Sequence, residues 1–176
     1  MFGDPRLGRG LRVGFGYDSH RFDEARPLVL GGVRIPNHPG LRGHSDGDAV
    51  VHAIIDALLG AAALGDIGRH FPPSEPRWKD ADSMELLASV VELLAQSDLR
   101  VCNVDVTVIT ERPSIAASAP QMVTSLSAAL GTAHDAISIK GKTNEGMGWI
   151  GAGEGMAVHA VALLKGTPDD GVPQST

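Results

Sequence analysis

The sequence predicts one domain of the α/β (α+β) class, with a single mixed β-sheet backed by helices on one face. Two observations lead to this class: apolar strand-like segments alternate with apolar helical segments, and 176 residues suffice for one domain with a buried core. Aromatic residues make up only 4% of the chain, so the core is expected to consist mainly of Ala, Val, Leu and Ile. We expect the folded domain at residues 11–165, a loose N-terminal extension at 1–10 and a disordered tail at 166–176.

The predicted strands are short apolar segments bounded by glycine, proline or polar residues, at residues 11–17, 28–35, 101–110, 137–141 and 156–164. The clearest alternation of apolar and polar residues covers residues 104–108. Gly31 and Gly32 interrupt the second strand, and the prolines and glycines of residues 36–43 predict a loop after it.

Three helices are predicted between these strands. The first is nearly all apolar, opens at Ser45 and Asp48 with capping-box spacing, and runs to about residue 64. The second follows a proline-containing loop, starts at Asp82 and Glu85 with the same spacing, and ends near residue 97. The third covers residues 118–131.

Charge and composition narrow the classes of partner. The net charge is −6 and no basic block is present, so a nucleic-acid partner is not expected. No apolar run approaches the roughly 18 residues that span a bilayer, so a membrane is not expected either. The single cysteine excludes an internal disulfide, and the absence of a signal or transit sequence favours the bacterial cytoplasm.

Three residues form a candidate metal site. Asp18 and His20 are two apart after a predicted strand, so they point to the same side in extended backbone. His52 lies in a polar stripe of the first helix, four residues from both Asp48 and Asp56. Two imidazoles and one carboxylate suit zinc and leave its fourth position open. The alternative is that Asp-x-His occurs by chance and His52 is a satisfied core residue.

Two further segments contain groups that suit phosphate. Ser45 and Asp48 are expected to cap the helix that follows, and His44 and Ser45 could hold a phosphate beside that cap, because the first amides of a helix attract anions. Lys142 and Thr143 offer phosphate contacts and Glu145 offers a ligand for a hard cation, whereas the alternative for residues 142–145 is a polar turn. The glycines of residues 148–155 do not match a P-loop.

Together these residues resemble the 2-C-methyl-D-erythritol 2,4-cyclodiphosphate synthase family. The resemblance rests on residues 16–20, 43–48 with His52 and Asp56, 64–68, 71–72, 103–106 and 142–145, which follow one another in the family's order. It implies a phosphorus–oxygen lyase of the isoprenoid (methylerythritol phosphate) pathway. The implied substrate is 4-diphosphocytidyl-2-C-methyl-D-erythritol 2-phosphate, whose 2-phosphate attacks the β-phosphorus to form the cyclic diphosphate and release CMP.

The resemblance also implies roles for individual residues. Asp18, His20 and His52 are implied as zinc ligands, and Glu145 as the ligand of a Mg²⁺ or Mn²⁺ ion, with Thr143 and Glu145 as catalytic residues. The substrate-binding set that it implies is His44, Ser45, Asp56, Asp66, Ile67, Gly68, Phe71, Thr110, Glu111, Arg112, Pro113, Ser114, Ile115, Ala116, Lys142, Thr143, Asn144 and Trp149. Within this set, the resemblance implies that His44 and Ser45 contact the 2-phosphate and that Asp56, Asp66 and Gly68 hold the methylerythritol or nearby hydroxyls. It implies that residues 110–116, with Lys142 and Thr143, line the pocket of the cytidine and α-phosphate. The family further implies a homotrimer with active sites between subunits.

Two positions depart from the family's pattern. Lys142 replaces a common threonine and adds a positive charge near the diphosphate, and Ala152 replaces an arginine associated with a central trimer cavity, so no ligand is expected in that cavity. The chain has no room for a fused cytidylyltransferase, so one activity is expected. Two other functions stay open: a zinc-dependent phosphate hydrolase that uses water, and a non-catalytic zinc-binding paralogue.

Overall fold

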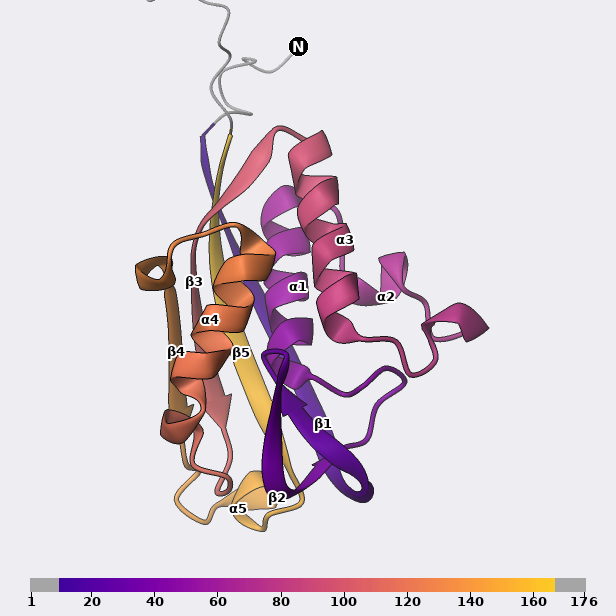
Figure 1. Ribbon diagram of the computed structural model, residues 1–176, viewed down its shortest axis with the longest axis vertical. Coiled ribbons are helices and arrows are strands. Elements are labelled where there is room, and N and C mark those ends of the chain that lie inside the picture. Colours follow the sequence, from indigo (N-terminus) through magenta and orange to yellow (C-terminus); the bar gives the residue numbers. More distant parts are fainter. Residues whose placement is uncertain (1–9, 167–176) are drawn as a thin grey trace, which may run out of the picture.

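The protein contains one five-stranded sheet with strand order β2-β1-β5-β3-β4 (Figure 1). The computed structural model describes residues 10–166, so the extension and tail expected at 1–10 and 166–176 fall, apart from Gly10 and Gly166, outside the described residues. The strands are β1 (Leu11–Leu30), β2 (Val33–Leu41), β3 (Leu99–Ile109), β4 (Ile137–Lys142) and β5 (Gly155–Gly166). β3 and β4 pair in parallel and the other neighbours pair antiparallel, which confirms the predicted mixed sheet.

Three long helices cover one face of this sheet: α1 (Ala49–Ala62), α3 (Ser83–Gln96) and α4 (Ala119–Leu130) (Figure 1). Shorter helical segments complete the fold, namely α2 (Ile67–His70), η2 (Pro76–Trp78), η3 (Ile115–Ala117), η4 (His134–Ala136) and α5 (Gly148–Gly151). The α+β class with one sheet and helices on one face is therefore confirmed. Within residues 10–166, no helix has the length and apolar character that a membrane span requires.

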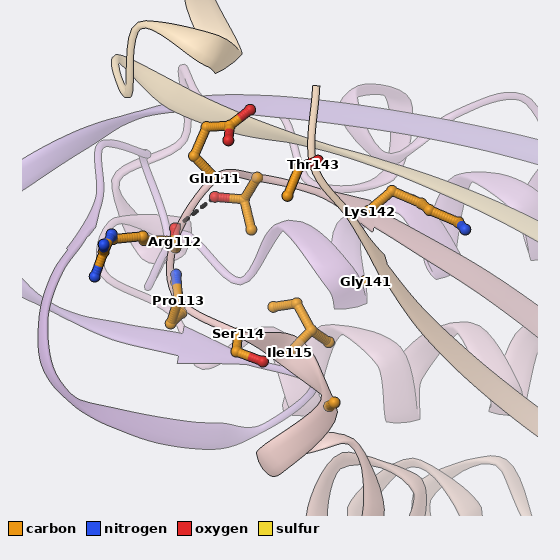
Figure 2. Close-up of a pocket in the computed structure, with 10 residues that line it drawn as sticks. Glu111, Arg112, Pro113, Ser114, Ile115, Gly141, Lys142 and Thr143 are labelled. Atoms are coloured by element: carbon orange, nitrogen blue, oxygen red, sulfur yellow. Dashed lines mark hydrogen bonds between the residues drawn. The ribbon is translucent and has the colours of Figure 1, made fainter. Parts of the chain in front are cut away.

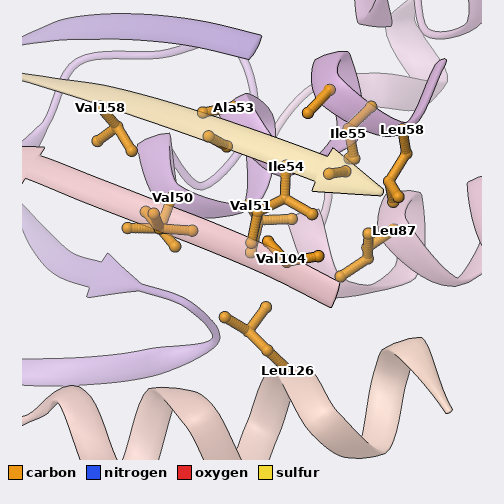
Figure 3. Packing of buried hydrophobic residues seen from close by; sticks show 14 of the residues in the cluster. Val50, Val51, Ala53, Ile54, Ile55, Leu58, Leu87, Val104, Leu126 and Val158 are labelled. Atoms are coloured by element: carbon orange, nitrogen blue, oxygen red, sulfur yellow. The ribbon is translucent and has the colours of Figure 1, made fainter. Parts of the chain in front are cut away.

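Helix α1 is the centre of the core. Eleven of its residues are buried, and it packs against strands β1, β3 and β5 and helix α3. Figure 3 shows Ile54 of α1 in the same apolar cluster as Val104, Leu126 and Val158. Strand β1 lies unusually close to it. A Cβ atom built on Gly14 or Gly16 would lie 1.9 Å from a backbone oxygen of α1, so only glycine fits there.

The predicted strand at 28–35 is wrong as a single element. β1 continues from Leu11 to Leu30, the chain turns at Gly31 and Gly32, and β2 starts at Val33, which pairs with Leu30. Both glycines have positive φ values, 58° and 72°, as a two-residue hairpin requires. The loop predicted at 36–43 is also largely strand, since β2 runs to Leu41. Its prolines are tolerated because β2 is an edge strand.

The helix caps partly follow the prediction. Asp48, not Ser45, is the N-cap of α1, and its carboxylate accepts a hydrogen bond from Val51 N. Ser45 is turned toward His52 instead. Asp82 caps α3 through Met84 N, as expected from its spacing to Glu85.

The other face of the sheet carries no helix among the described residues. Alternate residues of β1 point away from α1, and Leu11, Val13, Phe15 and Tyr17 are 47–70% exposed. Val161 of β5 is 40% exposed. Apolar side chains are seldom gathered on an uncovered surface without a partner.

Candidate active site

The predicted metal ligands meet where β1 passes the first turn of α1. Asp18 and His20 project from the same side of β1, and His52 projects from α1 toward them. One ligand atom from each residue lies within 4.8 Å of the others. Asp18 Oδ2 is 2.8 Å from His20 Nε2 and 3.0 Å from His52 Nδ1. The strand–helix contact at Gly14 and Gly16 therefore sets the spacing of the cluster.

The donor set fits a divalent metal. His20 Nδ1 contacts the Arg42 carbonyl oxygen at 2.5 Å, which directs Nε2 toward the cluster. His20 Nε2 is buried and has no aligned hydrogen-bond partner among the described residues, even though Asp18 is near. A buried nitrogen without a partner is costly unless a cation occupies its lone pair. Three protein ligands leave one position for a substrate oxygen.

The charges at this cluster favour an ionised carboxylate. Burial raises the pKa of Asp18, but the facing imidazoles of His20 and His52 outweigh burial and lower that pKa to about 2. For His20, burial lowers the pKa, yet the neighbouring Asp18 carboxylate reverses this and raises it overall. The site thus holds a permanent negative charge beside two nitrogen donors.

A pocket of about 270 Å³ opens directly on the metal ligands. It brings together most of the residues predicted on this side, namely Asp18, His20, His44, Ser45, His52, Asp56, Ile67, Gly68 and Phe71. Asp66 does not line it and instead caps α2 by accepting from Arg69 N. Asp56 Oδ1 accepts from Ile67 N at 2.8 Å, which fixes α2 at the rim.

Three lining residues of this pocket, Pro73, Trp78 and Leu86, were not predicted from the sequence. Nor was Ser83, whose hydroxyl lies 2.9 Å from His52 Nε2. Trp78 lies on Phe71, edge to face with ring centroids 5.0 Å apart. Proline and an aromatic residue in a loop carry no local signal of function, so these positions follow only from the tertiary structure.

A second pocket of about 400 Å³ lies at the ends of β3 and β4 (Figure 2). It brings together the residues predicted around the cytidine and α-phosphate, with Gly141 in addition; the lining is Thr110, Glu111, Arg112, Pro113, Ser114, Ile115, Ala116, Gly141, Lys142 and Thr143. Thr110 Oγ1 donates to the Arg112 carbonyl oxygen, which holds the turn that forms the wall.

The loop after β4 is anchored by Glu111. Its Oε1 accepts from Asn144 N at 2.9 Å and from Gly146 N at 3.2 Å. Between these amides, Thr143 Oγ1 donates to Glu145 Oε1 at 3.0 Å. The exposed Glu145 carboxylate is thereby held close to the hydroxyl of Thr143.

Trp149 lines neither of these two pockets. It lines a hollow of about 340 Å³ with Ser19, His20, Arg21 and Glu154, in which Arg21 and Glu154 form an ion pair of 3.2 Å. Among the described residues, none lines both the metal pocket and the pocket at the ends of β3 and β4. A single chain therefore presents two separate pockets, one beside the candidate metal ligands and one lined by the cationic Arg112 and Lys142.

Known proteins are similar to this chain in sequence and in fold. The sequence pattern of the YgbB family matches residues 11–165. A Gloeobacter violaceus protein named 2-C-methyl-D-erythritol 2,4-cyclodiphosphate synthase is 55% identical over 155 residues, which cover 88% of this chain and 95% of that protein. A Symbiobacterium thermophilum protein of the same name is 54% identical over 156 residues, 89% of this chain and 99% of that protein.

Solved structures agree with these relatives. The CDP complex of Plasmodium falciparum IspF has a TM-score of 0.80 at 35% identity and covers 91% of this chain and 99% of that one. The bifunctional IspDF from Campylobacter jejuni has a TM-score of 0.86 at 38% identity and covers 89% of this chain, which spans only 42% of that longer protein. The match over residues 11–165, which include the candidate metal ligands and both pockets, together with relatives more than 50% identical, shows that the chain belongs to the YgbB family.

Proposed function

We propose that the protein converts 4-diphosphocytidyl-2-C-methyl-D-erythritol 2-phosphate to 2-C-methyl-D-erythritol 2,4-cyclodiphosphate and CMP. The observation that carries this proposal is the cluster of Asp18, His20 and His52 at the wall of a pocket that also contains His44 and Ser45. The bacterial relatives that bear the name of this synthase support it. We also propose the bacterial cytoplasm as its location. The relatives are bacterial, and a single cysteine, which cannot form an internal disulfide, fits a reducing compartment.

The reaction joins two groups of one substrate molecule. An oxygen of the 2-phosphate attacks the β-phosphorus, a new P–O bond closes the ring, and the bond between β-phosphorus and the bridging oxygen breaks. The bridging oxygen leaves with the electron pair as part of CMP. Such a displacement depends on positioning and charge neutralisation more than on a strong base.

The residues of the metal pocket are suited to the 2-phosphate and the methylerythritol. His44 and Ser45 lie just before helix α1, whose N-terminal end favours negative charge. Asp56 faces the same pocket and offers an acceptor to substrate hydroxyls, while Phe71 and Trp78 exclude water from one side.

Two divalent cations complete the proposal. We assign Zn²⁺ to Asp18, His20 and His52, and Mg²⁺ or Mn²⁺ to Glu145. When bound, these cations neutralise phosphate charge and orient the reacting oxygens. Imidazole ligands suit zinc, whereas a lone carboxylate together with substrate phosphates suits Mg²⁺.

The pocket at the ends of β3 and β4 is proposed to hold the cytidine and α-phosphate. Lys142 supplies a positive charge to the diphosphate, and the Thr143 hydroxyl is placed to contact the same group. The relative solved with CDP supports a cytidine nucleotide as the occupant.

We further propose that three copies assemble with each active site between neighbours. The exposed apolar face of β1 and β5 gives each copy a surface to cover, and the two pockets of one chain, which share no lining residue, would combine with those of neighbouring copies. Light scattering coupled to size-exclusion chromatography tests this: a mass of three chains supports the assembly, and a monomer at assay concentration contradicts it.

The function is tested by phosphorus NMR of the purified protein with substrate, Zn²⁺ and Mg²⁺. Equal amounts of CMP and a cyclic diphosphate are expected. CMP with an acyclic phosphate product would indicate a hydrolase instead. An unchanged spectrum from zinc-loaded protein would refute catalysis and indicate a binding paralogue. His52→Ala is the control and is expected to give no product.

A further inference from the structure

The second ring nitrogen of His52 lies between two hydroxyl groups. His52 Nε2 is 2.9 Å from Ser45 Oγ and 2.9 Å from Ser83 Oγ. Ser45 lines the metal pocket, whereas Ser83 is the first residue of α3, is fully buried and lies behind the histidine. The two hydroxyls therefore have different surroundings although they are equally far from the nitrogen.

The direction of the Ser83 hydrogen bonds follows from Asp46. Ser83 Oγ donates to Asp46 Oδ1 at 2.5 Å, and Ser83 N donates to Asp46 Oδ2 at 3.0 Å. An ionised carboxylate only accepts, and a serine hydroxyl has one hydrogen to give. The hydrogen of Ser83 is thus committed to Asp46, and its oxygen presents a lone pair to His52 Nε2.

A lone pair facing Nε2 requires a hydrogen on that nitrogen. The neutral imidazole has one N–H, so a proton at Nε2 leaves Nδ1 as the electron-pair donor. Nδ1 is the atom that faces Asp18 and the metal cluster. The opposite tautomer would place two lone pairs 2.9 Å apart at Ser83.

We infer that Ser83, oriented by Asp46, is a positioning residue that holds His52 in the tautomer able to bind a metal through Nδ1. The inference deepens the proposed function, because it rests on the metal site assigned there. The Asp18 carboxylate has the opposite effect: it lies 3.0 Å from Nδ1 of His52 and favours the tautomer with the proton on Nδ1. Without the Ser83 hydroxyl, we expect the interaction with Asp18 to place the proton on Nδ1.

Backbone hydrogen bonds hold the Asp46–Ser83–His52 hydrogen-bond chain in place. Asp46 N donates to the Ala81 carbonyl oxygen at 3.1 Å, and Asp80 N donates to the His44 carbonyl oxygen at 2.8 Å. The segment that precedes α3 is thereby fixed to the loop that precedes α1. Ser45 Oγ, by contrast, donates to no carboxylate among the described residues and lies 3.4 Å from Ser83 Oγ.

The tautomer can be read directly in metal-free protein labelled with ¹⁵N-histidine, by long-range proton–nitrogen correlation above the titration range of histidine. We expect His52 Nε2 to carry the proton in the wild type and Nδ1 to carry it in Ser83→Ala. Zinc affinity, measured against a competing chelator, is expected to fall about 10- to 100-fold in Ser83→Ala. Asp46→Asn, whose amide can donate to Ser83 and free its hydrogen, should shift the proton in the same direction.

Ser45→Ala is the matched control, since it removes the other hydroxyl at the same 2.9 Å and should leave the tautomer unchanged. A wild-type spectrum with the proton of His52 on Nδ1 would overturn the inference. This test needs no variant, so it stays valid even if Ser83→Ala fails to fold. An unchanged tautomer and zinc affinity in folded Ser83→Ala would overturn it as well. If Ser83→Ala shifts the tautomer but the wild type forms no cyclic product, the proposed function is rejected and the role of Ser83 in positioning His52 is retained.

Discussion

Replacing Gly16 with alanine should damage both the fold and the metal site. The new Cβ would lie 1.9 Å from the Ala53 carbonyl oxygen and 2.7 Å from Ala57 N, all backbone atoms of α1. Ordinary contact needs about 3.5 Å, so strand and helix would have to separate by roughly 1.5 Å. Neither partner can rotate away, because both are main chain.

The expected cost lies at the upper end of overpacking, about 3 kcal/mol. For a domain of this size, that corresponds to a fall in Tm of about 6–12 °C. The same separation moves His52, next to Ala53, away from Asp18, two residues after Gly16. Metal sites tolerate distance changes of only about 0.2 Å, so zinc binding should be lost or greatly weakened.

Scanning calorimetry and a zinc titration of Gly16→Ala measure the two effects. Gly60→Ala is the control, because Gly60 is exposed on α1 and its new Cβ would meet only the Phe15 carbonyl oxygen at 4.0 Å. This variant should gain up to about 1 kcal/mol from helix propensity. A Gly16→Ala protein with wild-type Tm and zinc affinity would refute the idea that this contact sets the ligand spacing.

Three other outcomes are expected. Thorough chelation should abolish turnover, and Zn²⁺ with Mg²⁺ should restore it in the wild type but not in His52→Ala; activity that survives chelation would contradict the two-cation proposal. Zinc affinity should be constant above the raised pKa of His20 and fall about tenfold per pH unit below it, because a proton then competes for Nε2, while Asp18, with its pKa of about 2, stays ionised; a chelator competition series that stays flat down to about pH 5 would contradict this. Phe15→Asp, on the exposed apolar face, should lower the mass measured by light scattering while the far-ultraviolet circular dichroism stays native, since Phe15 is 61% exposed in one chain; an unchanged mass would place the interface elsewhere.

Local sequence signals predicted the elements that depend on local chemistry. Asp82 caps α3 as its spacing to Glu85 indicated, and the Asp18–His20 pair lies on one side of a strand as extended backbone requires. The hairpin at Gly31 and Gly32 was misinterpreted as an interruption, because an apolar segment with two glycines looks the same in one strand or in two. Only pairing with β1 distinguishes them.

Site residues that depend on distant contacts escaped prediction for a related reason. Ser83 looks like an ordinary first residue of a helix, and its role appears only when the segment before α3 is fixed to Asp46. Trp78 likewise reaches the pocket through a loop whose course depends on hydrogen bonds to residues 44–46. Sequence spacing cannot reveal contacts across more than thirty residues.

The candidate metal ligands lie on two elements that are joined by hydrogen bonds and by close backbone contacts. The buried Asp48 carboxylate accepts from Gly31 N at 2.9 Å, Gly32 N at 2.7 Å and Val51 N at 3.0 Å, so it joins the β1–β2 hairpin to the start of α1. The glycine contacts of β1 fix the same two elements further along. His52 lies on α1 between these two attachments, which explains how a site made of only three ligands from two elements keeps its geometry before any cation binds.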